Sequence, residues 1–185
     1  DQRLSFNRVD EHVLERRHDP LHRSRAVASG REKLENAAAA FVVGSEHVIA
    51  EIEATASLTR EFLDTWRTPG ERFGHSWEER FTLTQAYAPL LGKAIQNVLA
   101  TAKIVPSALT KVILDAPNMR AADEIARGMK LEPAQLTDPL ALTVGQAGAA
   151  HSGVLLANVL AAAKPGDRIL VAAAGDGADA ILLRV

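Results

Sequence analysis

Cysteine is absent from the 185-residue sequence, and its absence excludes several kinds of chemistry. Without a thiol, the chain has no disulfide, no thiolate metal ligand and no cysteine nucleophile of its own. No uninterrupted apolar run reaches the length of about 18 residues that a membrane-spanning helix requires. The first residues are charged and do not resemble a signal peptide, so we expect a soluble, cytoplasmic protein with no membrane partner.

Aromatic residues and net charge are also scarce. Aromatic side chains make up 4% of the sequence and the formal net charge is -2, so the chain lacks the basic surface that nucleic-acid binding needs. We therefore expect no nucleic-acid partner. Apolar residues, in contrast, make up 47% of the sequence, which is enough to form a sizeable core. The length favours a single domain.

Residues 1–35 are rich in Arg, His, Asp and Glu, and their apolar positions follow neither the helical nor the strand period. This composition predicts a peripheral arm or a partly disordered lead-in. It contains three histidines, His12, His18 and His22. Their spacing matches neither a helical pair nor a zinc-finger pattern, so we interpret them as surface histidines and predict no metal site.

From Asn36 the composition becomes apolar and small. The runs AAAAFVVG and VIAEIEATAS predict a strand, a turn and a second strand, in which Val48, Ala50, Ile52 and Ala54 share one buried face. The stretch TWRTPGERFGHSW carries proline and glycine and predicts a loop. Ser76 is placed to cap the next helix, with Glu79 as its capping-box partner. Pro89 then predicts either two helices or one kinked helix.

The remaining sequence alternates helices and strands. KVILDAP predicts a short buried strand ending at Pro117, and Asn118 is placed to cap a helix over MRAADEIARGMK. A polar linker, LEPAQLTDPLA, precedes the stretch VGQAGAAHSG and a helix over residues 153–163. Two runs, RILVAAAGDG and ADAILLRV, complete the chain as strands. The order predicts an α/β fold in which helices cover a mainly buried sheet in three layers.

The early and late strand pairs, each with a turn of small residues, look like one motif used twice. The pattern G-x-x-G-A-A-x-x-G over residues 145–153, followed by a helix and KPGDRILVAAAGDGADA, resembles the C-terminal end of the thiolase superfamily. Its hydroxymethylglutaryl-CoA synthase-like branch is the most similar. ENAAAAFVVG resembles the strand that closes the N-terminal half of that fold. TREFLDTWRTPGERFGHSWEERF resembles the segment that leads into the C-terminal half.

This resemblance implies a thiolase-like fold, namely the C-terminal half of a duplicated αβαβα sandwich together with the last two strands of the N-terminal half. Residues 36–65 would end the N-terminal half and residues 76–185 would form the C-terminal half. The resemblance also implies acyl-CoA as substrate, with no further cofactor. In the family, a cysteine from the N-terminal half takes the acyl group, and a histidine and an asparagine from the C-terminal half assist carbon–carbon bond formation.

Two family motifs occur in altered form. The pattern His, any residue, Pro, Asn is here Asp115-Ala116-Pro117-Asn118, and the Gly-Asn turn before the helix is Gly145-Gln146. His151 either replaces the lost imidazole, if its ring faces the same cavity, or packs at the start of the helix. The candidate catalytic residues are therefore Asp115, Gln146 and His151. The candidate substrate-binding residues are Pro117, Asn118, Gly145, Gly148, Gly175 and Gly177.

The glycines allow a structural and a functional interpretation together. Gly145 and Gly148 permit positive φ and close helix approach, and they also let a thioester oxygen reach backbone amides. GDGADA predicts a tight hairpin turn beside the site, because no helix follows it to bind a phosphate. Asp176 and Asp179 would also repel a phosphate group.

A lone half of a sandwich fold would expose apolar surface, at a cost of roughly 1.5 to 3 kcal/mol per large side chain. We therefore expect an oligomer, in which a separate chain, the rest of a longer protein or a second copy covers that face. The expected partners are an N-terminal thiolase half or a catalytic thiolase-like chain, and the resemblance adds an OB-fold protein with a zinc ribbon. The leading functional hypothesis is a subunit or fragment of an acyl-CoA-handling enzyme. The alternatives are a non-catalytic structural subunit and a stand-alone small-molecule binder.

Overall fold

The computed structural model describes residues 37–117, 119–175 and 177–185. The arm predicted for residues 1–35, with its three histidines, lies outside the described residues. A four-stranded mixed sheet forms the centre, in the order β1-β6-β5-β4, with only β4 and β5 parallel. Its strands are β1 (Glu51–Thr59), β4 (Lys111–Asp115), β5 (Arg168–Ala174) and β6 (Gly177–Arg184).

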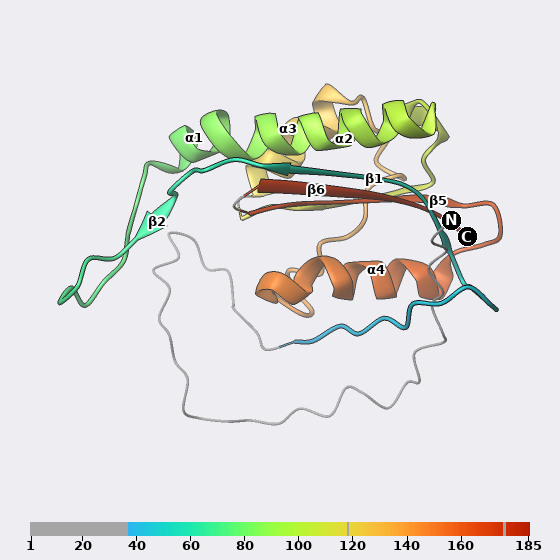
Figure 1. Cartoon of the computed structure of the whole chain (residues 1–185), viewed down its shortest axis with the longest axis horizontal. Coiled ribbons are helices and arrows are strands. Elements are labelled where there is room, and N and C mark those ends of the chain that lie inside the picture. Colours follow the sequence, from blue (N-terminus) through green and yellow to red (C-terminus); the bar gives the residue numbers. More distant parts are fainter. Residues whose placement is uncertain (1–36, 118, 176) are drawn as a thin grey trace.

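Helices cover both faces of the sheet, which confirms the predicted α/β class with three layers (Figure 1). On one face lie α2 (Ala88–Ala102) and α3 (Met119–Gly128), and on the other lies α4 (His151–Ala162). The order of helices and strands from α2 onward is the one that the sequence predicts. In the described residues, none of the helices has both the length and the apolar character that a membrane span needs.

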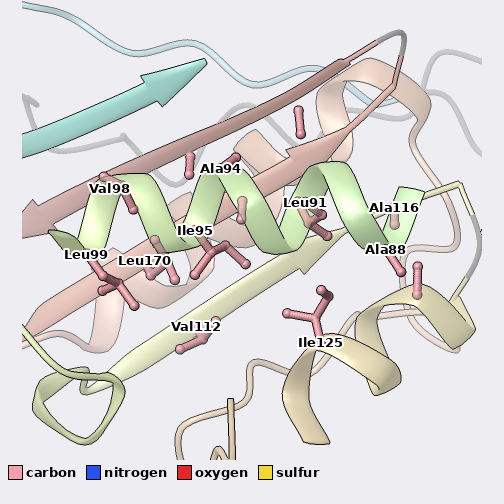
Figure 2. Packing of buried hydrophobic residues seen from close by; sticks show 14 of the residues in the cluster. Ala88, Leu91, Ala94, Ile95, Val98, Leu99, Val112, Ala116, Ile125 and Leu170 are labelled. Carbon is pink, nitrogen blue, oxygen red and sulfur yellow. The ribbon is translucent and has the colours of Figure 1, made fainter. Parts of the chain in front are cut away.

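The core consists of two apolar clusters, one on each face of the sheet. The larger cluster packs α2 and α3 against the sheet, and Figure 2 shows Ile95 and Leu99 of α2 beside Leu170 of β5. Alternation along the strands separates the two clusters: Leu170 belongs to the larger one, while its neighbour Ile169 packs with Leu155 of α4. Both faces of β5 are therefore buried, which explains its continuous apolar sequence.

A bulge in β1 contradicts the single buried face predicted for its alternating residues. Ile52 pairs with Leu183 and Ala54 with Leu182, so Glu53 is an extra residue in the register. Because one extra residue reverses which face the following side chains occupy, Ile52 packs on the α4 side and Ala54 on the α2 side. The Glu53 carboxylate accepts two hydrogen bonds from the Arg168 guanidinium, at 2.8 and 3.1 Å.

The strand predicted for residues 37–44 does not form, so the first of the two predicted strand pairs is wrong. This segment runs beside α4 (Figure 1), and a Cβ placed on Gly153 would lie 2.7 Å from the Ala39 Cβ. No described strand lies next to it to exchange backbone hydrogen bonds, and a strand needs such a partner. Val42 and Val43 remain exposed at 59% and 57%.

The loop predicted from TWRTPGERFGHSW contains a short two-stranded sheet, β2 (Thr65–Trp66) with β3 (His75–Ser76). Ser76 therefore pairs with Thr65 instead of capping a helix. The helix α1 (Glu79–Thr82) begins after Glu78 without a side-chain cap, so the predicted capping box is wrong.

Pro89 lies at the start of α2, and the helical stretch before it contains a π-helical turn over Leu83–Tyr87. The ring nitrogen of Pro89 cannot donate to the carbonyl four residues earlier. That carbonyl, of Gln85, instead accepts a hydrogen bond from the Arg60 guanidinium at 2.8 Å. The helical stretch is continuous from α1 through the π-helical turn to the end of α2, so it is one helical run interrupted by a π turn and not two separate helices.

Candidate active site

The predicted site residues meet at one edge of the sheet. Asp115 ends β4, and because β5 runs parallel to β4, its last residues end at the same edge. The turn into β6 brings Gly175 and Gly177 to this edge, and the 3₁₀ turn Gly148–Ala150 leads into α4 there. Segments far apart in the sequence are thus brought together by the parallel pairing of two strands.

A cavity of about 780 Å³ opens at this edge. Among its lining residues are the following candidates from the sequence: Asp115, Pro117, Gln146, Gly148, Gly175 and Gly177. Gly145 and His151 do not line this cavity but a second one of about 390 Å³, to which Asp115 and Gln146 also contribute. Asn118 lies outside the described residues. The structure therefore places the two altered family positions, Asp115 and Gln146, between two cavities.

The Asp115 carboxyl is partly buried and bonded to its neighbours. Burial raises the pKa of this carboxyl above its ordinary value of 3.8. Three groups oppose that rise: the charge of His151, the backbone N–H of Ser152, which donates to the carboxylate, and the side-chain amide of Gln146. Ser152 lies in the first turn of α4, where unpaired amides and the helix dipole favour a negative group.

His151 is buried, with 5% of its surface exposed, and its Nδ1 atom has no hydrogen-bond partner among the described residues. The Oε1 atom of Gln146 is likewise buried without such a partner. To replace the lost imidazole, His151 has to face the same cavity as Asp115 and Gln146. It lines the second cavity together with these two residues, but it does not line the first.

Two of the predicted glycines adopt positive φ, which confirms their conformational role. Gly145 has a φ of 78° and Gly148 a φ of 57°, values that other residues rarely adopt. Asp176 of GDGADA lies outside the described residues, but β5 and β6 on either side of it pair antiparallel, as the predicted hairpin requires, and the Gly175 N–H donates to the Gly177 carbonyl oxygen at 3.0 Å. The glycines therefore shape the turns that border the cavity.

Sequence reasoning missed the contribution of β1 to the first cavity. Ser57, Leu58 and Thr59 line it, because the end of β1 pairs with the start of β6. Ser152, which no motif singled out, also lines it. The sequence predicted β1 only as part of a strand pair with residues 37–44. It did not indicate that β1 would pair with β6.

No group of three or more histidine, aspartate or glutamate side chains with the arrangement of a metal site occurs in the described residues. The polar groups at the cavity are instead a carboxyl, an amide and backbone N–H groups. Such a set can accept or deliver a proton at Asp115 and donate hydrogen bonds to an oxygen on which negative charge develops.

Replacing Asp115 with asparagine should increase stability at neutral pH more than at acidic pH. Because the carboxyl has a raised pKa in the folded state, that state holds its proton more tightly than the unfolded state does. The free energy of unfolding therefore falls as the pH rises from the ordinary pKa of 3.8 through the raised pKa of the folded state. At higher pH it stays at this lower value. The side-chain amide of the variant does not titrate, so the Asp115→Asn protein avoids this loss.

The measurement is chemical denaturation of both proteins from below pH 3.8 to about pH 7. Asp123→Asn, which removes an exposed carboxyl on α3, is the matched control. A stability difference for Asp115→Asn that stays constant across this range would contradict the assignment.

Comparison with curated proteins identifies hydroxymethylglutaryl-CoA synthases as relatives, although no family model matches the chain. The chain is 34% identical over 143 residues to a hydroxymethylglutaryl-CoA synthase from Methanopyrus kandleri, covering 76% of the chain and 40% of that protein. It is 32% identical over 142 residues to the corresponding synthase from Thermoplasma volcanium, and this match covers 75% of the chain and 40% of that protein. The chain thus spans about 40% of the length of these relatives.

Solved structures agree on the fold. The 3-oxoacyl-[acyl-carrier-protein] synthase III of Aquifex aeolicus matches with a TM-score of 0.66 at 21% identity, covering 78% of the chain and 48% of that protein. A thiolase from Ascaris suum, solved in complex with coenzyme A, matches with a TM-score of 0.54 at 13% identity. This match covers 74% of the chain and 31% of the thiolase. The chain is therefore similar to part of the hydroxymethylglutaryl-CoA synthases, and its mixed α/β fold is thiolase-like and corresponds to less than half of the proteins that it matches.

Proposed function

We propose that the chain supplies part of an acyl-CoA site in a hydroxymethylglutaryl-CoA synthase-like or thiolase-like enzyme. The observation that carries this proposal is the convergence of Asp115, Gln146 and the Gly148 turn on one cavity of about 780 Å³. Its volume lies in the range of cavities that hold small-molecule ligands. The relatives named above are synthases, which supports the same class of reaction.

Asp115 is placed to act as the base. In its ionised form it takes a proton from the carbon next to the thioester carbonyl, and the electron pair of that C–H bond moves onto the thioester oxygen as an enolate. The raised pKa of the Asp115 carboxyl makes it a stronger base than an exposed aspartate. Ser152 N–H and the Gln146 amide hold the carboxylate in place.

Gln146 is placed to stabilise the enolate oxygen. Its amide nitrogen has two hydrogens; one bonds to Asp115, which leaves the other for an oxygen in the cavity. A donor aimed at the atom where negative charge develops lowers the barrier to the reaction. The enolate carbon then bonds to the carbonyl carbon of an acyl group held elsewhere as a cysteine thioester, and the C–S bond of that thioester breaks, so that the cysteine leaves as a thiolate. The cysteine is held elsewhere because this chain has none.

The proposal includes a second protein segment that completes the site. We propose that the nucleophilic cysteine comes from an N-terminal thiolase half, either in the same polypeptide or on a separate chain. Support comes from the coverage, since the chain corresponds to only 40% of each named synthase. Exposed Val42 and Val43 beside α4 offer apolar surface to such a segment.

Calorimetric titration of acetyl-CoA into the native assembly, purified with any chain that accompanies it, tests the proposal. We expect saturable binding, and we expect Gln146→Ala to raise the dissociation constant by about three- to tenfold, the effect of one lost hydrogen bond. Gln96→Ala, on the exposed face of α2, is the matched control and should leave it unchanged.

Absence of binding by the assembly would contradict the acyl-CoA proposal. If acetyl-CoA binds but the triple variant Asp115→Ala, Gln146→Ala, His151→Ala keeps full condensing activity, the chain is a non-catalytic structural subunit instead.

A further inference from the structure

The second cavity, of about 390 Å³, lies against the proposed active site and has no role in the chemistry described above. It shares only Asp115 and Gln146 with the first cavity, so these two side chains form the boundary between them. Its walls come from β4, α3 and the loop over residues 136–145. A group bound there would lie next to the two residues proposed to carry out the reaction.

Three buried polar atoms have no hydrogen-bond partner among the described residues, and all three belong to residues that line this cavity. They are Thr137 Oγ1, Gln146 Oε1 and His151 Nδ1. Folded proteins satisfy nearly all buried polar groups, so three unpaired atoms around one space indicate that an occupant supplies their partners. His151, with 5% of its surface exposed, is a buried part of the lining, while Leu142, which also lines the cavity, is fully exposed to solvent.

Thr137 is held in place independently of any ligand. Its backbone N–H donates to the Val112 carbonyl oxygen at 3.1 Å, and its neighbour Leu136 forms a parallel bridge with Val112. These contacts fix the loop along the edge of β4. The hydroxyl of Thr137 is therefore held at the cavity by the backbone before anything binds.

The chemistry of the lining restricts the occupant. Gln146 Oε1 can only accept a hydrogen bond, and the Thr137 hydroxyl can accept one, so the occupant must donate. Two carboxyls, Asp115 and Asp123, line the cavity, and His151 is the one basic side chain of the described residues that does, so acidic groups outnumber basic ones and an anionic group is disfavoured. The rest of the wall is apolar: Val112, Leu114, Ala122, Ala126, Leu136 and Leu142. An uncharged donor on a short hydrocarbon chain fits these conditions.

We propose that this cavity binds the acyl portion of the substrate and selects acyl thioesters whose chain carries an uncharged hydroxyl group. The inference rests on the proposed function, because it takes the thioester end to lie at Asp115 and Gln146. The hydroxyl donates to Gln146 Oε1 or Thr137 Oγ1, and the hydrocarbon contacts the apolar wall. An unsubstituted chain leaves the polar atoms unpaired, and a carboxylate faces two acidic side chains.

The test compares three ligands by calorimetry with the native assembly: 3-hydroxybutyryl-CoA, butyryl-CoA and succinyl-CoA. We expect 3-hydroxybutyryl-CoA to bind about three- to tenfold more tightly than butyryl-CoA, and succinyl-CoA to bind most weakly. Thr137→Val, which keeps the shape and removes the hydroxyl, should reduce this preference, because 3-hydroxybutyryl-CoA loses a hydrogen-bond partner and butyryl-CoA leaves one fewer polar atom unpaired. Thr101→Val, on the exposed face of α2, is the matched control and should keep the preference.

The possible failures are distinguishable. If all three ligands bind equally well, or if Thr137→Val keeps the full preference, the inference is wrong while the acyl-CoA proposal stands. If none of the three binds, the proposed function fails and the inference fails with it.

Discussion

Replacing Leu91 with alanine should lower the free energy of unfolding by about 2 to 5 kcal/mol, the range measured for large-to-small changes in protein cores. Leu91 is fully buried, at 0% exposure, in the cluster between α2 and the sheet (Figure 2). The variant loses the transfer free energy of three carbon atoms and leaves a cavity that rigid neighbours cannot fill.

Denaturant unfolding followed by circular dichroism measures this loss. Leu63→Ala is the matched control, because the same change is made at a side chain that is 64% exposed, and it should cost far less. Similar losses for the two variants would contradict the packing of α2 described above.

Replacing Gly177 with alanine should destabilise the protein by about 3 kcal/mol, the upper part of the usual range for overpacking. A Cβ at this position would lie 2.2 Å from the Leu58 carbonyl oxygen, a backbone atom of the adjacent strand. Because Gly177 pairs with Thr59, the methyl group would push apart the ends of β1 and β6. Leu58, Thr59 and Gly177 all line the first cavity, so acetyl-CoA binding should also weaken.

Gly175→Ala is a close control for this effect. A Cβ on Gly175 meets nothing within 4 Å, and its φ is not positive, so the same change should be nearly neutral. The two residues lie in one turn and border the same cavity. Equal stability of the two variants would show that β1 does not lie against Gly177 as described.

The helices and strands from α2 to β6 could be predicted from the sequence because their signals are local. KVILDAP is a short, mainly apolar run that ends at a proline, and MRAADEIARGMK follows Asn118, a residue type favoured at helix starts. The meeting of Asp115 with the glycine turns also followed from local order, once the resemblance to thiolases had assigned their places in the fold. The α/β class was thus accessible without coordinates.

The errors arose where distant segments determine the outcome. Residues 37–44 have the composition of a strand, but no described strand pairs with them. The bulge at Glu53 depends on pairing with β6 and on Arg168, which is 115 residues away. Alternation within one segment therefore could not show that Ile52 and Ala54 face opposite layers.

The second cavity was inaccessible for the same reason. Thr137 belongs to a stretch that the sequence marks only as a polar linker, and its position follows from a bridge with Val112. Its unpaired hydroxyl indicates a binding site only because the unpaired atoms of Gln146 and His151 line the same cavity. Such a site depends on which atoms lack partners, and this property exists only in three dimensions.

The central claim is that Asp115 and Gln146 face the reacting end of an acyl-CoA thioester. A crystal structure of the native assembly with a non-hydrolysable acetyl-CoA analogue tests it most directly. We predict that the carbonyl oxygen of the analogue accepts a hydrogen bond from the Gln146 amide, with the adjacent carbon next to the Asp115 carboxylate. An analogue bound with its carbonyl away from both side chains would contradict the account.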